Sequence, residues 1–152
     1  MTAAVAANRN TFRDAIMVFK PRIAVFIMLS ATGGMAVAQG SMPEFWRLAV
    51  LALAVFLAAG SAGAFNQWVE RDLDARMSRT AKRPFVTGQF TAGPLWLPAI
   101  VGLLAVSVLM AGLATNWWAA LYTFLGAFTY GVIYTMWLKR RSWTNIIIGG
   151  LA

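Results

Sequence analysis

The sequence predicts an all-α protein, a polytopic transmembrane helical bundle with four complete helices and the start of a fifth. Of its 152 residues, 60% are hydrophobic and only 12% are charged. A water-soluble domain of this length leaves about a third of its chain surface exposed, so it could not bury so many apolar side chains. Four long apolar segments and the grouping of the basic residues predict the same class.

The four apolar segments approach the roughly 20 residues that a helix needs to cross a bilayer. They cover residues 22–38, 46–65, 96–113 and 117–138. None has the period-two alternation of a membrane β-strand. Prolines stand near the starts of the second and third segments, and tryptophans stand near segment ends, as the membrane interface favours: Pro43, Pro94, Trp46, Trp96, Trp117, Trp118 and Trp137.

The basic residues set the expected orientation. Twelve of the thirteen Lys and Arg residues lie before or at the first residue of the first segment, in the 66–92 loop or in the 139–143 loop, and only Arg47 lies elsewhere. Positive residues favour the cytoplasmic side, so the N-terminus and both basic loops should face the cytoplasm. We therefore expect an integral protein of the bacterial inner membrane. A cleaved signal peptide ending at Ala36-Val37-Ala38 is the alternative for the first segment, but its basic region would be unusually long.

Composition excludes several functional classes. The chain has no Cys and no His, so it cannot supply disulfides, thiolate metal sites, Cys or Ser–His nucleophiles or His-ligated haem from its own residues. The formal net charge of +8 would suit nucleic acid, but a lipid-soluble body argues against that partner.

The long connection at residues 66–93 carries the candidate chemistry. Asn66, Glu70 and Asp74 are spaced i, i+4 and i+8, and on a helix they drift only about 40° per step, so they should share one face. One amide and two carboxylates form a hard-oxygen set that suits Mg²⁺ and a diphosphate. Asp72 should point away from that face and form a helical ion pair with Arg76.

Basic side chains follow directly. They could neutralise a diphosphate beside the metal, and arginine does so with two hydrogen bonds. The same cluster could equally reflect only the topology of the chain, with acids placed opposite for balance. The basic residues of this cluster are Arg79, Lys82 and Arg83. Taken alone, they leave both interpretations open.

The motifs resolve the choice. The stretch from Ala64 to Pro84 resembles the first motif of the UbiA superfamily of intramembrane prenyltransferases. Further motifs resemble the branch of that superfamily that farnesylates haem b: Lys20-Pro21-Arg22, Gly33-Gly34-Met35, Met77-x-Arg79-Thr80, Tyr134-Thr135, Leu138-Lys139-Arg140 and Thr144-Asn145-Ile146-x-Ile148-Gly149-Gly150.

This resemblance implies roles for individual residues. The metal and catalytic positions of the family fall on Asn66, Glu70 and Asp74, where Glu70 replaces the commoner aspartate. The diphosphate-binding positions fall on Arg79, Arg83, Lys139 and Arg140. The remaining candidates near the pocket are Asp72, Tyr134, Asn145, Lys20 and Arg22.

The implied reaction transfers a farnesyl group from farnesyl diphosphate to a vinyl group of haem b, with addition of water and release of diphosphate. Mg²⁺ is the implied cofactor, and haem b is a substrate. Membrane lipid surrounds the protein, and the implied protein partners are downstream haem-modifying or oxidase-assembly membrane proteins. The alternatives are a prenyltransferase acting on another aromatic acceptor such as 4-hydroxybenzoate, a half-transporter, and a non-catalytic bundle.

The end of the chain carries a separate expectation. Residues 144–152 begin a fifth apolar segment that is too short to cross a bilayer. The second acidic motif of the resembled family has no counterpart in the sequence. We therefore expect residues 1–152 to be the N-terminal part of one prenyltransferase domain and to be inactive alone.

Overall fold

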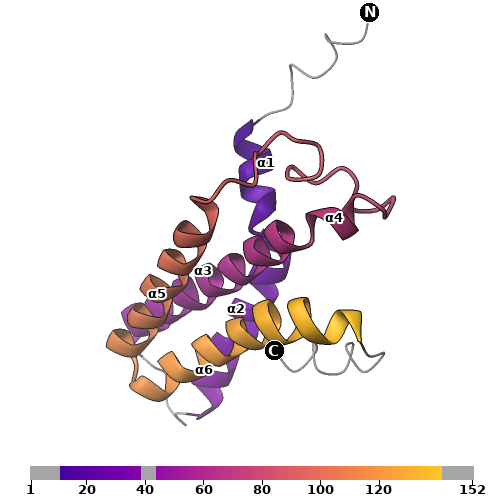
Figure 1. Ribbon diagram of the computed structural model, residues 1–152. Coiled ribbons are helices and arrows are strands. Elements are labelled where there is room, and N and C mark those ends of the chain that lie inside the picture. The colour runs from indigo at the N-terminus through magenta and orange to yellow at the C-terminus, as the bar shows by residue number, and fades with distance from the viewer. Residues whose placement is uncertain (1–10, 39–43, 142–152) are drawn as a thin grey trace, which may run out of the picture.

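The computed structural model describes residues 11–38 and 44–141 of the chain, and these residues form a helical bundle (Figure 1). Within the described residues there is no β-strand, and four helices are long and apolar enough to span a membrane: Pro21–Ala38, Phe45–Val69, Trp96–Ala114 and Trp117–Trp137. The predicted all-α class is confirmed. The expected start of a fifth helix at 144–152 lies outside the described residues.

The central element is α3 (Phe45–Val69), against which α2 (Pro21–Ala38), α5 (Trp96–Ala114) and α6 (Trp117–Phe128) all pack (Figure 1). Its buried face consists largely of small residues, including Ala54, Ala58 and Gly60. Small side chains let neighbouring helix backbones approach closely, which favours packing inside a membrane. One buried hydrogen bond reinforces the packing of α3 on α5, since the Ser61 hydroxyl donates to the Ile100 carbonyl on α5 at 2.8 Å.

The fourth apolar segment is not one regular α-helix. After α6, a π-helix (η1, Thr129–Trp137) and a short 3₁₀ helix (η2, Leu138–Arg140) continue the chain. The Asn116 side chain caps α6 by accepting from the Ala119 amide at 2.8 Å, a common way to satisfy a first-turn donor. π-Turns inside helices are uncommon and frequently occur at functional sites.

One further element was not expected from the sequence, and the helical path expected through Asp74 is interrupted at Glu70. The basic N-terminal region contains α1 (Thr11–Val18), which joins α2 through a tight turn. The predicted 66–93 connection begins later, because α3 continues to Val69, and it contains a helical turn, α4 (Arg71–Asp74). Many large apolar side chains on α2, α5 and α6 are exposed, as lipid-facing surfaces require.

An aromatic cluster holds the connection onto the bundle. Phe85 is buried with Val18, Ala64 and Ile100, and its ring meets the Trp96 ring edge-on, with centroids 5.0 Å apart. Such packing fixes the loop that carries the basic residues over the end of α3.

Candidate functional site

A cationic cavity of about 930 Å³ lies at the end of the bundle where α1, the end of α3 and the basic connection meet. Among residues 11–38 and 44–141, seven Lys or Arg residues line it against one acidic residue, Asp14. This imbalance creates a positive potential that attracts anions into the cavity. The cationic lining residues are Arg13, Lys20, Arg22, Arg79, Lys82, Arg83 and Lys139.

Asn66 and Glu70 lie together at the end of α3. The Asn66 amide donates to Glu70 Oε2 at 2.8 Å, and the Lys139 ammonium of η2 donates to the same oxygen at 2.7 Å. The Glu70 amide also donates to the Asn66 carbonyl at 3.0 Å, which keeps the helical path although α3 ends one residue earlier. Because Glu70 is only 1% exposed, its charge needs this compensation.

Asp74 lies one turn further on. Its amide donates to the Glu70 carbonyl at 2.8 Å, so a backbone hydrogen bond links each of the three predicted residues to the next, although Glu70 itself separates α3 from α4. The Asp74 carboxylate accepts a hydrogen bond from the Arg83 guanidinium, and its carbonyl accepts one from the Thr80 hydroxyl at 2.9 Å. These contacts fold the connection back over α4 and bring Arg83 to the cavity.

The set Asn66, Glu70 and Asp74 fits a hard divalent cation by its chemistry. Glu70 Oε1 is buried without a hydrogen-bond partner among the described residues, which is unusual for a carboxylate oxygen and leaves it available as a ligand. No group of three or more His, Cys, Asp or Glu residues in the described ranges could hold a metal ion. A magnesium site here would depend on two carboxylates together with the Asn66 side-chain oxygen, and each of these three groups already pairs with a Lys or Arg side chain.

Lys20 occupies the centre of the site. Its ammonium donates to the Asn66 side-chain oxygen and, at 3.1 Å, to the Tyr130 hydroxyl. Its backbone has a φ of 49°, a conformation that costs a non-glycine residue about 1–2 kcal/mol. Burial, followed by repulsion from Arg83, lowers the pKa of Lys20 to about 8.

Helix α3 supports the Lys20 turn. The Gln67 side chain donates to the carbonyls of Met17 and Val18 at 3.1 and 2.9 Å. A Cβ atom at Gly63 would lie 3.3 Å from the Phe19 carbonyl oxygen and 3.4 Å from the Lys20 Cβ. The absence of a side chain at Gly63 therefore lets the turn approach α3 closely.

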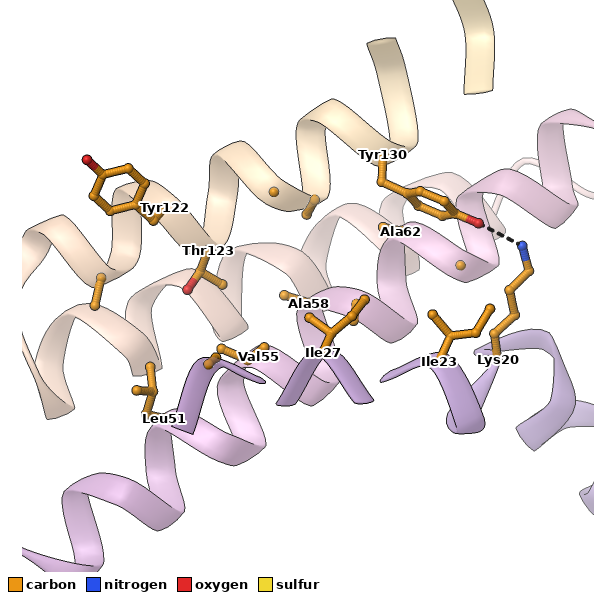
Figure 2. A pocket seen from close by; sticks show the side chains of 16 residues that line it. Lys20, Ile23, Ile27, Leu51, Val55, Ala58, Ala62, Tyr122, Thr123 and Tyr130 are labelled. Atoms are coloured by element: carbon orange, nitrogen blue, oxygen red, sulfur yellow. Dashed lines mark hydrogen bonds between the residues drawn. The ribbon is translucent and has the colours of Figure 1, made fainter. Parts of the chain in front are cut away.

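A second cavity, of about 520 Å³ and mostly apolar, lies between α2, α3 and α6 (Figure 2). Alkyl side chains such as Ile27 and Val55 form much of its wall. Figure 2 shows Lys20 and Tyr130 meeting at one end of this cavity and Tyr122 at the other. Lys20, Ile23 and Tyr130 line both cavities, so a polar compartment adjoins an apolar one.

The structure places the sequence candidates in three groups. Seven line the cationic cavity: Lys20, Arg22, Asn66, Arg79, Arg83, Tyr134 and Lys139. Glu70 and Asp74 do not line it but are buried behind Lys139 and Arg83, because their charges pair with those cations. The side chain of Arg140, and Asn145 altogether, lie outside the described residues.

Asp72 differs from its expected pairing. Its side chain is 87% exposed and lies 4.0 Å from Arg71 rather than against Arg76. The reason is that α4 ends at Asp74, so residues 72 and 76 are not one helical turn apart.

Sequence reasoning missed Tyr130 and Gln67. Tyr130 stands four residues before the candidate Tyr134, and this spacing was the available signal. Gln67 gave no signal, because an amide beside an apolar helix end has many possible partners.

Comparisons with known proteins give a consistent result. Residues 27–152 match the model of the UbiA prenyltransferase family. The chain is 53% identical over 135 residues to protoheme IX farnesyltransferase 2 of Paramagnetospirillum magneticum, covering 89% of the chain and 47% of that protein. It is 43% identical over 158 residues to protoheme IX farnesyltransferase of Hyphomonas neptunium, covering 99% and 48% respectively.

The chain thus spans about half the length of the curated relatives that it matches. No solved structure matches it significantly.

Proposed function

The chain belongs to the UbiA prenyltransferase family, and we propose that the protein transfers a farnesyl group from farnesyl diphosphate to a vinyl group of haem b, giving haem O and diphosphate. The pair of adjoining cavities carries the proposal. Farnesyl diphosphate has an anionic head and a hydrocarbon tail, and it matches a cationic compartment that opens onto an apolar one. Relatives named protoheme IX farnesyltransferase support the choice of both substrates.

The diphosphate would lie among the cations. Arg83 and Lys139 are held in place by Asp74 and Glu70, so their charges are already oriented before a substrate binds. Charges fixed in this way stabilise the negative charge that develops on a departing diphosphate, without reorganisation during the reaction. Arg79 and Arg140 complete the proposed diphosphate-binding set.

Magnesium is the proposed cofactor. Asn66, Glu70 and Asp74 would hold it, and Glu70 Oε1, which has no hydrogen-bond partner within the described part of the chain, supports their role as ligands. A bound Mg²⁺ would add charge neutralisation at the diphosphate oxygens.

The function is tested by analysis of haems. The full-length gene product is expressed from its natural reading frame in bacteria that lack their own haem O synthesis, and haems are extracted and separated. We expect haem O to accumulate. A prenylated benzoate in place of haem O would support the aromatic-acceptor alternative, and no prenylated product at all would contradict the proposed reaction.

Orientation follows from the basic residues. We propose that the cationic cavity faces the cytoplasm and that the α2–α3 and α5–α6 connections face outward across the inner membrane. Protein partners that use or further modify the haem product would then meet this one in the same membrane.

Single cysteines test this orientation, because the sequence has none of its own. Cysteines are introduced at two exposed residues, Arg76 in the basic connection and Glu44 before α3. In intact cells, we expect an impermeant thiol reagent to label Glu44→Cys and to label Arg76→Cys only after the membrane is opened. The reverse pattern would overturn the orientation.

A further inference from the structure

Tyr130 stands at the boundary between the two cavities. Its hydroxyl accepts the hydrogen bond from Lys20 at 3.1 Å, and the Lys20 ammonium lies 5.6 Å from the centroid of its ring (Figure 2). Together with the hydroxyl contact, this distance places the ammonium beyond the hydroxyl oxygen and near the ring plane, not over the ring face that a cation–π contact uses. Lys20 therefore contacts the hydroxyl end of Tyr130, and the ring lies at the point where the polar compartment meets the apolar one.

Neighbouring residues fix the position of this ring. The Tyr134 ring stacks on it with centroids 5.4 Å apart and an angle of 11° between the planes. The Thr135 hydroxyl donates to the Tyr130 carbonyl at 2.8 Å, and the same hydroxyl accepts from the Asn66 amide at 3.1 Å. The π-helix η1 thus ties the Tyr130 backbone to the end of α3, and the ring has little freedom to move.

The boundary is also where the reacting carbon of the proposed substrate would lie. The diphosphate would lie among the cations and the hydrocarbon chain in the apolar cavity. The carbon bonded to the departing oxygen would then lie beside the residues that line both cavities. Two of these three residues, Lys20 and Ile23, offer no π system. Tyr130 offers one.

We infer that Tyr130 is a catalytic residue whose ring stabilises the positive charge on the allylic carbons of the farnesyl group, an inference that rests on the proposed function. The carbon–oxygen bond breaks, and its electron pair leaves with the diphosphate. The electrons of the vinyl double bond then form the new carbon–carbon bond. Water adds to the cation left on the acceptor and releases one proton.

The inference predicts that the rate depends on the electrons of the ring and not on its shape. In the full-length protein, Tyr130 is replaced by phenylalanine and then by phenylalanines carrying one, two and three fluorine atoms. Fluorine withdraws electrons from the ring face and hardly changes its size. We expect kcat to fall stepwise, by about 30-fold over the series, which corresponds to one desolvated cation–π contact.

Two measurements separate this role from packing. The affinity for a non-hydrolysable farnesyl thiodiphosphate and the melting temperature should stay constant through the series. The control is the same fluorinated series at Phe128, which lies on the same helical segment and lines neither cavity, and kcat there should stay constant. If kcat stayed constant through the Tyr130 series in an active protein, or fell equally through the Phe128 series, the inference alone would be overturned. A wild-type protein that does not consume farnesyl diphosphate would contradict the proposed function and the inference together.

Discussion

Replacing Asp74 by asparagine is expected to lower farnesyl transfer at least 100-fold while the protein still inserts into the membrane. The substitution removes one charge and almost no volume. Asp74 is 2% exposed and binds Arg83, so the loss affects both the proposed metal set and the orientation of a diphosphate-binding guanidinium. Loss of one oriented electrostatic contact commonly costs a factor on the order of 100–1000 in rate. Haem O formation per unit of inserted protein measures the effect.

Asp72→Asn is the matched control. The Asp72 side chain is exposed, and its contact with Arg71 is a surface pair that contributes little. Asp72→Asn should therefore retain most of the activity. The double variant Asp74→Asn with Arg83→Gln removes the unpaired cation that the single change leaves. If that double variant recovered activity, or if Asp74→Asn kept more than about a tenth of the wild-type rate, the catalytic role of Asp74 would be rejected.

Replacing Lys20 by methionine is expected to produce the second large effect. The change keeps the length of the side chain but removes the charge that contacts both Asn66 and Tyr130. A hydrogen bond to a charged group contributes about 1.5–3 kcal/mol, which corresponds to a loss of about 10- to 150-fold in kcat/KM. Affinity for inorganic pyrophosphate, measured on the same purified protein, should fall in parallel because the head group loses a cation.

Arg76→Met is the control for Lys20. Arg76 is exposed and lines neither cavity, although it carries the same charge. It should keep kcat/KM within about threefold, the size expected for a surface charge. If Lys20→Met and Arg76→Met behaved alike, Lys20 would contribute only to the general positive charge of this end of the protein.

The sequence was sufficient to predict the spanning helices, because membrane thickness demands a minimum apolar length and composition reveals it directly. It was also sufficient for the helical backbone spacing that links Asn66, Glu70 and Asp74, because helical hydrogen bonding is local. The ion partners were beyond its reach. Lys139 is 69 residues from Glu70, and only the packing of η1 against α3 brings them within 2.7 Å.

The missed elements have a similar explanation. The short α1 carries exposed apolar residues beside one basic residue, Arg13, and sequence alone does not separate such a segment from a disordered basic tail. The π-helix is invisible to hydrophobic periodicity, because a mainly apolar sequence continues through it from α6. The apolar cavity could not be foreseen either, since it depends on how α2, α3 and α6 pack against one another, with Val55 and Ala58 among the residues that line it.

The π-helix η1 sets the direction in which the residues after it point. Within η1 each turn contains more residues than an α-turn, so its nine residues wind less far around the helix axis than nine α-helical residues would. A return to α-helical hydrogen bonding at the same chain length would therefore rotate the residues that follow Trp137 around the axis. Lys139 would turn away from Glu70 even though no residue at the site had changed. A substitution between Thr129 and Trp137 that favours α-helical over π-helical winding would thus act on the Glu70–Lys139 pair without touching either residue.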